Sequence, residues 1–278
     1  MSNFLQRTAP VIENVQVARD TWRIRLEQPE IARVIRPGQF LMLRLLGMSD
    51  PLLGRPYALY DTVLTTNGDP SGLDVVYLVV GKQTRRLAQV RPGDAVALWG
   101  PLGNGFPELD GLRHVWFVAG GIGQTPFLAY TRALLGTRGY GGDRPRRRVE
   151  RVSLFYGVRT ADLAAGVEDF LAAGADVHLA SDDGSVGHPG LVTQLLSLHP
   201  PGQHIVACGP TPMMQAVAEF AQMAGVPCHL SLETPMACGV GVCFSCVTRV
   251  RDGDDRDYRR VCVEGPVFDA ATVDLQFH

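Results

Sequence analysis

The hydrophobic and polar positions of this chain follow two different periods in its first and second parts. Up to about residue 108, apolar residues alternate with polar ones or form short runs, as at 22–26, 38–45 and 74–81, and Gly-, Pro- and Asp-rich turns separate the runs. Alternation with a period of two is typical of half-buried strands. Several short strands at this spacing predict an antiparallel β-barrel or sandwich over residues 1–108.

From about residue 112, short apolar runs alternate with segments of helical period. We expect buried strands at 114–119, 152–156, 177–180 and 205–207, and helices at 125–135, 191–198 and 211–224. Strands that alternate with helices indicate a doubly wound, mostly parallel sheet, here over residues 109–229. An Arg-rich stretch at 137–151 interrupts this pattern. We interpret it as a solvated loop, with partner docking as the alternative.

Two glycine turns follow expected strands of this sheet and open expected helices. The first reads A-G-G-I-G-Q-T-P from Ala119, and the second reads C-G-P-T-P-M-M from Cys208. Ligands in open α/β sheets collect at the carboxyl ends of the strands, so both turns favour a nicotinamide nucleotide, although the first departs from G-x-G-x-x-G. Taken alone, Cys208 is also compatible with a small buried residue. The candidate residues are Gly120, Gly121, Gly123, Cys208, Gly209 and Pro210.

Two further motifs lie in the β segment. Arg55-Pro56-Tyr57-Ala58 falls between two expected strands, where the Arg suits a flavin phosphate and the Tyr suits a flavin ring. The alternative is a purely structural role, in which Arg55 is a surface residue beside a rigid turn. Gly81-Lys-Gln-Thr84 leads into an expected helix, whose N–H groups suit a pyrophosphate, and the alternative is an ordinary helix cap at Thr84.

Four of the six cysteines lie near the C-terminus in a C-x4-C-x2-C pattern followed by one distant Cys: Cys238, Cys243, Cys246 and Cys262. This is the ligand spacing of a plant-type [2Fe–2S] cluster. Gly239 and Gly241 allow the loop to turn tightly around such a cluster. A zinc site would use paired C-x2-C spacings, found here only once, and a disulfide framework would require an oxidising compartment. The spacing therefore favours an electron-carrying iron–sulfur lobe over residues 230–278, with zinc and disulfides as alternatives.

Composition narrows the function further. Hydrophobic residues make up 46% and charged residues 19%, which is ordinary for a globular protein, and a net charge of −2 gives no electrostatic case for nucleic acid. The sequence shows no signal-peptide run and no apolar stretch long enough to span a membrane, so we expect a cytoplasmic protein. The seven histidines are scattered without metal-ligand spacing, and we interpret them as structural or solvated.

Taken together, R-P-Y-A, G-x-x-T, A-G-G-I-G-Q-T-P and C-G-P-T-P-M-M resemble the ferredoxin–NADP⁺ reductase superfamily. The motifs E-T-P-M-A-C-G-V-G-V-C-F-S-C and V-C-V-E-G-P-V-F narrow the resemblance to the electron-transfer subunits of dihydroorotate dehydrogenase B, and it covers nearly the whole chain in motif order. The resemblance implies an FAD-binding β-barrel over 1–108, an NAD-binding α/β domain over 109–229 and a small [2Fe–2S] lobe over 230–278.

The resemblance also implies roles for particular residues. It makes Arg55, Pro56, Tyr57 and Ala58 a flavin-facing loop, places Val76, Tyr77 and Leu78 beside the FAD and Gln83 and Thr84 at its diphosphate, and makes Cys238, Cys243, Cys246 and Cys262 the cluster ligands. The sequence departs from the family at several positions. Ala58 replaces a Ser or Thr, Leu78 an Arg and Gln83 a Gly, and the acidic stretch 252–257 lengthens the gap before the last cysteine.

The function implied by the resemblance is electron transfer in pyrimidine synthesis. Dihydroorotate would reduce the FMN of a separate catalytic subunit, and electrons would pass through the [2Fe–2S] cluster and FAD to NAD⁺, with no side chain of this chain acting as acid or base. Two of each subunit would form a heterotetramer. The alternatives are an NAD(P)H-dependent flavin and iron–sulfur reductase for another redox partner, and a non-catalytic redox or metal-stabilised binding module. The sequence leaves the choice between NAD and NADP open.

Overall fold

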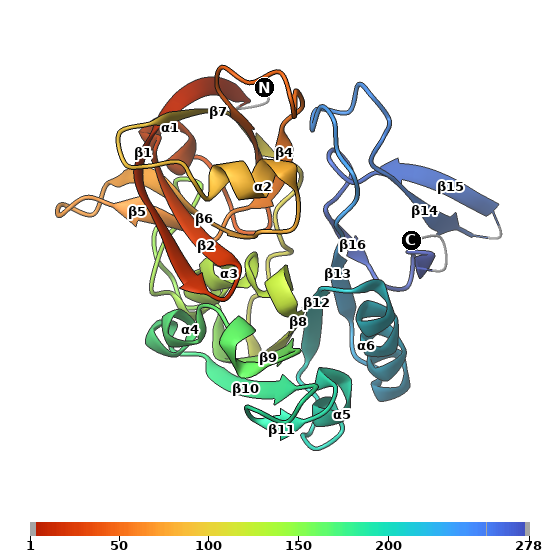
Figure 1. The fold of residues 1–278 in the computed structure, drawn as a ribbon. Coiled ribbons are helices and arrows are strands. Elements are labelled where there is room, and N and C mark those ends of the chain that lie inside the picture. Colours follow the sequence, from red (N-terminus) through yellow and green to blue (C-terminus); the bar gives the residue numbers. More distant parts are fainter. Residues whose placement is uncertain (1–3, 254, 276–278) are drawn as a thin grey trace.

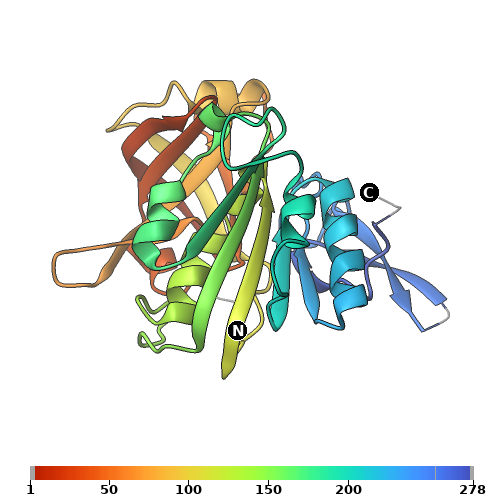
Figure 2. The same cartoon turned by 90° about the horizontal axis from the view of Figure 1, so that it is seen from below.

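A computed structural model of the chain describes residues 4–253 and 255–275. The first three residues of the N-terminal segment, Asp254 of the acidic stretch and residues 276–278 lie outside the described part. The described chain forms a β-barrel, an α/β domain and a smaller lobe that carries the cysteines (Figures 1 and 2). The expected architecture, an antiparallel β-barrel followed by a doubly wound sheet and a small C-terminal lobe, is confirmed.

The barrel is a seven-stranded antiparallel sheet in the order β4-β3-β7-β1-β2-β6-β5. Its interior is filled by residues that alternate along the strands, such as Ile24, Leu41, Val75 and Leu98, which are all fully buried. Two short helices, α1 (Pro29–Ala32) and α2 (Lys82–Leu87), connect strands. The strands are β1 (Leu5–Ala18), β2 (Thr21–Glu27), β3 (Phe40–Leu45), β4 (Arg55–Ala58), β5 (Asp61–Leu64), β6 (Pro70–Leu78) and β7 (Ala95–Leu102).

The α/β domain is built on a second seven-stranded sheet in the order β11-β10-β9-β8-β12-β13-β16. All its neighbouring strands are parallel except β13 and β16. The strands are β8 (Leu112–Gly120), β9 (Val149–Val158), β10 (Asp176–Ser181), β11 (His188–Pro189), β12 (His204–Cys208), β13 (Cys228–Ser231) and β16 (Val267–Asp269).

Helices cover both faces of this sheet (Figure 2). Buried side chains of α3 and α4, such as Phe127 and Phe170, join one apolar cluster, and those of α5 and α6, such as Leu196 and Val217, join another. The helices are α3 (Phe127–Leu135), α4 (Val167–Ala173), α5 (Val192–Leu196) and α6 (Thr211–Ala224), with the 3-10 turns η1 (Gly121–Gln124) and η2 (Ala161–Leu163). The arrangement is the doubly wound one that the alternating pattern predicted.

The C-terminal lobe packs on both preceding parts. Strand β16 extends the nucleotide sheet by pairing antiparallel with β13, while β14 (Val247–Asp252) and β15 (Asp255–Arg260) form a two-stranded ribbon that projects from the body (Figure 1). The buried Cys246 and Cys262 lie in one apolar cluster with Phe40 and Met42 of the barrel. The lengthened gap before the last cysteine is therefore a β-hairpin.

The Arg-rich stretch 137–151 is less solvated than expected. Arg144 and Arg146 are exposed, as predicted for a surface loop, and the last residues of the stretch form part of β9. The interpretation is wrong for the beginning of the stretch, because Tyr140 is buried and both Arg138 and Tyr140 bind Asp61 of the barrel. The loop thus docks on the barrel through its own charged and aromatic side chains.

Candidate functional site

A cavity of about 720 Å³ lies at the carboxyl ends of β8, β9 and β12. We call it the nucleotide cavity. Its lining brings together five of the residues predicted from the two glycine turns: Gly120, Gly121, Gly123, Gly209 and Pro210. The two turns touch directly, since a Cβ atom added to Gly123 would lie 2.2 Å from the carbonyl oxygen of Cys208. Glycine is therefore required at position 123 for the β8 and β12 loops to meet.

A second cavity of about 340 Å³ lies between the barrel, the α/β domain and the cysteine lobe. We call it the junction cavity. The predicted residues Pro56, Ala58 and Cys208 line it, together with Phe40 of β3 and Met236, which lies two residues before Cys238. The junction cavity thus touches all three parts of the chain.

The Arg55–Ala58 motif is a strand, β4, and not a loop as we expected, while its flavin-facing role stays a prediction. Because side chains alternate along a strand, Pro56 and Ala58 face the junction cavity while Tyr57 points into the barrel. The ring of Tyr57 packs edge-on against that of Tyr77, with 6.0 Å between ring centres. Arg55 points outward, and its Nη1 donates hydrogen bonds to the carbonyls of Leu53 and Gly54.

The other residues expected beside the FAD are dispersed. Val76 and Tyr77 are buried in β6, while Leu78 lines the nucleotide cavity. The Nε2 of Gln83 donates to the Leu43 carbonyl at 2.9 Å, inside the barrel. The Thr84 hydroxyl accepts hydrogen bonds from the backbone N–H groups of Val80 and Gly81, both at 3.0 Å. The N-cap of α2 is therefore Gly81 and not Thr84, which is the third residue of the helix and caps its start from within.

The residues around the junction cavity fit a bound flavin. Thr234 lines this cavity, and its Oγ1 is buried without a hydrogen-bond partner. Buried polar atoms normally have partners, so an unpartnered oxygen that faces an apolar cavity is typical of a site that a ligand completes.

Glu233 lies where the two cavities meet, because it lines both of them. Its side chain is exposed in this cleft, and desolvation by the surrounding protein raises the pKa of its carboxyl group. Burial also raises the pKa of the Cys208 thiol strongly, with the nearby Glu233 carboxylate as a further cause. Cys208 is therefore an uncharged wall of the cavity. Our sequence analysis missed Glu233 as a site residue, although it opens the E-T-P-M-A-C motif.

The four predicted cluster cysteines lie as two pairs. Cys238 lies close enough to Cys243 to lower the pKa of its thiol, and Cys246 close enough to Cys262 to raise the pKa of that thiol. Among the residues that the structure describes, no three His, Cys, Asp or Glu side chains converge around a single point as ligands of one ion would. Two thiolate pairs match a [2Fe–2S] cluster, in which each of two irons takes two protein ligands.

The cysteine loop turns with Gly239 and Gly241 at positive φ, as predicted. Hydrogen bonds from Ser245 lower the pKa of the exposed Cys243 to about 6, whereas burial raises that of Cys262 to about 12. The backbone N–H of Val240 points to the Cys238 sulfur at 3.4 Å. The loop therefore offers one readily ionised thiol and a backbone donor to sulfur, both of which suit an iron–sulfur cluster.

Trp99 fixes this loop to the barrel. Its indole Nε1 donates to the Cys238 carbonyl at 2.9 Å, although the two residues are far apart in the sequence. A Cβ atom on Gly239 would lie 2.7 Å from the side chain of Met42, so the loop is pressed against β3. Sequence analysis did not find Trp99, because no local pattern announces a contact between β7 and the cysteine loop.

Comparison with known proteins agrees with this geometry. The iron–sulfur cluster binding domain of dihydroorotate dehydrogenase B matches residues 233–274, an oxidoreductase NAD-binding domain matches 117–219 and an oxidoreductase FAD-binding domain matches 8–106. The dihydroorotate dehydrogenase B (NAD⁺) electron transfer subunit of Bacillus caldolyticus is 36% identical over 93% of this chain and 95% of its own length. The chain belongs to this family.

Members of this electron-transfer subunit family include that of Desulforamulus reducens, which is 35% identical over 94% of this chain and 95% of its own length. Among solved structures, an NADH-dependent reduced ferredoxin–NADP oxidoreductase, described for flavin-based electron bifurcation, has a TM-score of 0.79 and 27% identity over 96% of this chain and 90% of its own. The predicted cofactors, FAD, NAD and an iron–sulfur cluster, are thereby confirmed. The assignment of single residues to them stays a prediction.

Proposed function

We propose that this chain carries electrons from dihydroorotate to NAD⁺ as the electron-transfer subunit of a dihydroorotate dehydrogenase B, in pyrimidine synthesis. Its partner in this proposal is an FMN-containing catalytic subunit, in an assembly of two plus two chains. The observation that carries the proposal is the junction cavity, whose lining comes from the barrel, the nucleotide domain and the segment before Cys238. One cavity with these three neighbours suits a flavin between a nicotinamide and an iron–sulfur cluster.

When bound, FAD couples the two-electron hydride chemistry of NAD(H) to the single-electron chemistry of an iron–sulfur cluster. The residues of this chain hold the cofactors in place and exclude water from them. In our proposal, Pro56 and Ala58 contact the flavin ring, and the unpartnered Thr234 Oγ1 offers it a hydrogen bond. Gly120, Gly121, Gly123, Gly209 and Pro210 hold the nicotinamide nucleotide at the ends of β8 and β12.

Apolar side chains connect the junction cavity with the cysteines. Phe40 and Met236 line the cavity and also belong to the apolar cluster that contains Cys246 and Cys262. Close apolar packing excludes water between the two redox sites and holds them at a fixed separation. We therefore assign Cys238, Cys243, Cys246 and Cys262 as the ligands of the [2Fe–2S] cluster.

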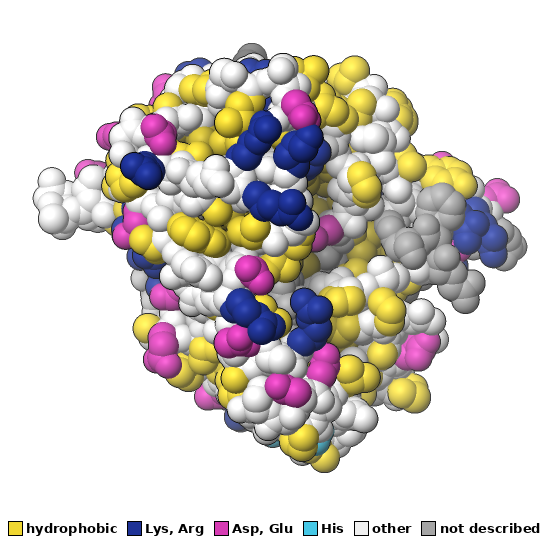
Figure 3. Space-filling view, viewed as in Figure 1, with side chains coloured by type: hydrophobic (Ala, Val, Ile, Leu, Met, Phe, Trp, Pro, Cys, Tyr) yellow, Lys and Arg dark blue, Asp and Glu magenta, His cyan; other side chains and the backbone are white. Residues whose placement is uncertain are grey.

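The cysteine loop also presents the face that we propose for the partner subunit. Val242 and Phe244 flank Cys243 and are 79% and 62% exposed, and Val240 and Val263 add to the same apolar surface. Hydrophobic side chains gather at this end of the molecule in Figure 3. We call Val240, Val242, Phe244 and Val263 the cluster face. Exposed apolar side chains gathered around a redox centre are typical of a protein interface.

Dihydroorotate-dependent reduction of NAD⁺, followed by absorbance, tests the proposal. The chain is purified anaerobically together with the cognate FMN-containing dihydroorotate dehydrogenase subunit. We expect NADH to form only when both chains are present. The mass of the complex should correspond to two copies of each chain. A pair that forms no complex and no NADH, while NADH still bleaches the flavin of this chain, would favour the alternative reductase with another redox partner. A protein without bound flavin or iron would favour the binding module.

The names of the relatives specify NAD⁺ as the nucleotide, and we propose the same nucleotide for this chain. Among the residues that the structure describes, no helix combines the length and the apolar character needed to cross a lipid bilayer. The cytoplasmic location stays a prediction.

A further inference from the structure

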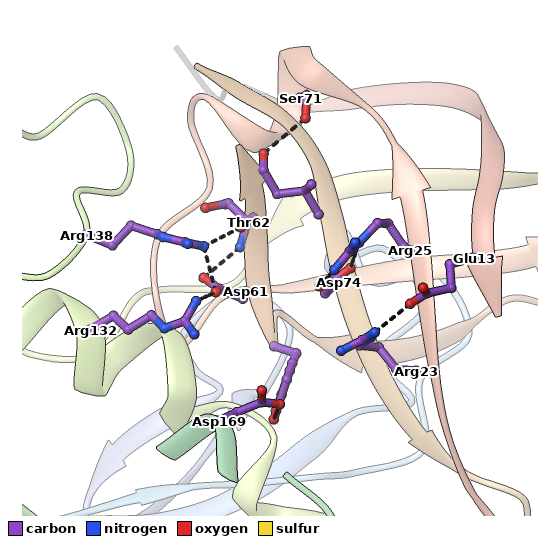
Figure 4. Close-up of polar contacts among 12 residues, drawn as sticks. Glu13, Arg23, Arg25, Asp61, Thr62, Ser71, Asp74, Arg132, Arg138 and Asp169 are labelled. Carbon is purple, nitrogen blue, oxygen red and sulfur yellow. Dashed lines mark hydrogen bonds and ion pairs between the residues drawn. The ribbon is translucent and has the colours of Figure 1, made fainter. Parts of the chain in front are cut away.

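A buried ionic cluster joins the barrel to the α/β domain away from both cavities. Its centre is Asp61, the first residue of β5, which is only 4% exposed (Figure 4). A buried carboxylate is costly unless opposite charges and hydrogen bonds compensate for lost water. Arg132 of α3 forms an ion pair with its Oδ2, and Arg138 does so at 2.6 Å. Both guanidinium groups belong to the other domain.

The remaining oxygen of Asp61 is satisfied as well. The Tyr140 hydroxyl donates to Oδ1 at 2.6 Å, and the backbone N–H of Thr62 donates to the same atom at 2.8 Å. Arg138 donates in addition to the Thr62 carbonyl. Asp61 therefore anchors the beginning of the Arg-rich stretch to the barrel.

Residues next to Asp61 add further contacts between the domains. The Tyr60 hydroxyl donates to Asp169 of α4 at 2.6 Å, and the backbone N–H of Ala129 in α3 donates to the Tyr60 carbonyl at 3.1 Å. Two buried residues in succession thus bind α3, α4 and the 138–140 segment. We call Tyr60, Asp61, Arg132, Arg138 and Tyr140 the interdomain clamp.

The elements joined by the clamp also form the cavities. The barrel segment that ends in Asp61 carries Ala58, which lines the junction cavity. Helix α3 carries Arg132. Pro126, just before the first residue of α3, lines the junction cavity, and the glycine turn that precedes Pro126 lines the nucleotide cavity. The clamp therefore fixes how far apart the flavin-contacting strand and the nucleotide-binding turn lie.

We propose that Asp61 is a positioning residue for hydride exchange, which it controls by fixing the two domains without touching flavin or nucleotide. The inference rests on the proposed function, because it presumes that FAD and NAD(H) meet at the junction of the two cavities. Reactions that depend on such proximity lose a hundredfold in rate on a displacement of about 1 Å. Loss of one buried charge between two guanidinium groups is sufficient to loosen the clamp.

The test is Asp61→Asn in the full chain loaded with FAD, studied by stopped-flow reduction of the flavin with NADH and with NADH deuterated at C4. We expect the rate constant of flavin reduction to fall by roughly tenfold to a hundredfold. The dissociation constant of NADH should change less than about twofold, and the long-wavelength absorbance band of the flavin–nicotinamide complex should weaken. A purely structural role would leave this band and the isotope effect unchanged in the folded fraction.

Asp74→Asn is the matched control. Asp74 lies opposite Asp61 in the β5–β6 register and is also buried, but its carboxylate pairs with Arg25 of the same barrel (Figure 4). An equal loss in both variants would overturn the proposal, as would wild-type kinetics in folded Asp61→Asn. If Asp61→Asn does not fold, Tyr140→Phe removes one clamp hydrogen bond and must show a smaller loss of the same kind. Failure of NADH to reduce the wild-type flavin would refute the proposed function instead.

Discussion

At the scale of single residues, Cys243 is the predicted cluster ligand most open to solvent, and it lies between the exposed Val242 and Phe244. We expect Cys243→Ser to lose the [2Fe–2S] cluster, because each iron needs two thiolates. Dihydroorotate-dependent NAD⁺ reduction should then disappear, whereas NADH-dependent reduction of a dye through the FAD should stay within about twofold. Iron and acid-labile sulfide per chain, measured beside both activities, provide the check.

Cys228→Ser is the control for this experiment. Cys228 is buried in β13, where burial raises the pKa of its thiol to about 12, and it lies outside the cysteine loop. Its replacement should leave iron content and both activities unchanged. Full iron content in Cys243→Ser, or equal loss of the two activities, would contradict the assignment of Cys243 as a ligand on the electron path.

Gly123 offers a second test at this scale. An added methyl group would lie 2.2 Å from the Cys208 carbonyl oxygen and force the glycine turns of β8 and β12 apart. We expect Gly123→Ala to raise the dissociation constant of NAD⁺ at least about tenfold, which titration calorimetry measures. Gly225→Ala, at the left-handed cap of α6, should destabilise the fold by about 1 kcal/mol without changing NAD⁺ affinity. Equal affinities in both variants would contradict the assigned role of Gly123.

The sequence locates the glycine turns and the cysteine loop, but it does not locate the residues that line the junction cavity. Turn motifs are local, so the positions of Gly123 and Cys243 follow from spacing alone. Whether a residue of β4 faces a cavity depends on which strand pairs with it, and that pairing is not local. For this reason Tyr57 was assigned to the flavin although it points into the barrel, while Thr234 was not named.

At the scale of secondary-structure elements, β12 and β13 are joined by a pair of imidazoles. The Nε2 of His204 lies 2.9 Å from the Nδ1 of His229. At this distance, one proton fits between the two nitrogen atoms, but two do not. Burial, and next the proximity of His229, lower the pKa of His204 to about 4, and burial lowers that of His229 against the opposing effect of Asp269. The pair is thus held neutral in the folded chain.

This pair predicts a loss of stability in acid. An unfolded histidine has a pKa of about 6.5, so between about pH 6.5 and 4 the unfolded chain binds more protons than the folded one, and stability falls as the pH falls. We expect the melting temperature to drop through this window. In His204→Gln the drop should be smaller by roughly 2–4 °C, the shift that about 1 kcal/mol causes in a chain of this size. Parallel pH profiles of the two proteins would show that the pair does not titrate as described.

Among the elements themselves, those with a strong period were predicted well. Helix α6 has the predicted bounds, because Pro212 near its start and Gly225 after its end mark both termini. Helix α3 starts later than predicted, since the glycine turn continues as a 3-10 turn to Gln124. Strand β1 was not predicted, because it is mostly exposed and contains Pro10. Backbone hydrogen bonds to β2 and β7 hold β1 in the sheet although its sequence lacks a hydrophobic pattern.

At the scale of the whole molecule, the three parts are tied by specific contacts and not by apolar packing alone. The interdomain clamp joins barrel and nucleotide domain, Trp99 joins barrel and cysteine loop, and β16 joins the lobe to the nucleotide sheet. Each contact thus joins a different pair of the three parts. The cluster face lies on the other side of the cysteine loop, turned toward solvent. The contacts that join the three parts are therefore separate from the exposed surface that we propose for the partner.

This separation predicts that binding of the partner can be removed without damage to the redox centres. Val242 is 79% exposed and lies next to a predicted ligand, so a charged side chain there reaches solvent in the free chain but is buried in a complex. We expect Val242→Asp to raise the dissociation constant for the catalytic subunit at least about thirtyfold, the effect of losing an interface hot spot. Flavin content, iron content and NADH-to-dye activity should stay at wild-type values.

Met223→Asp is the control for this experiment. It changes a residue of α6 that is 82% exposed and lies outside the cluster face, so partner affinity should stay unchanged in the same sedimentation or calorimetric measurement. Undiminished affinity in Val242→Asp would place the partner on another surface, and loss in Met223→Asp alone would point to the α6 side of the molecule.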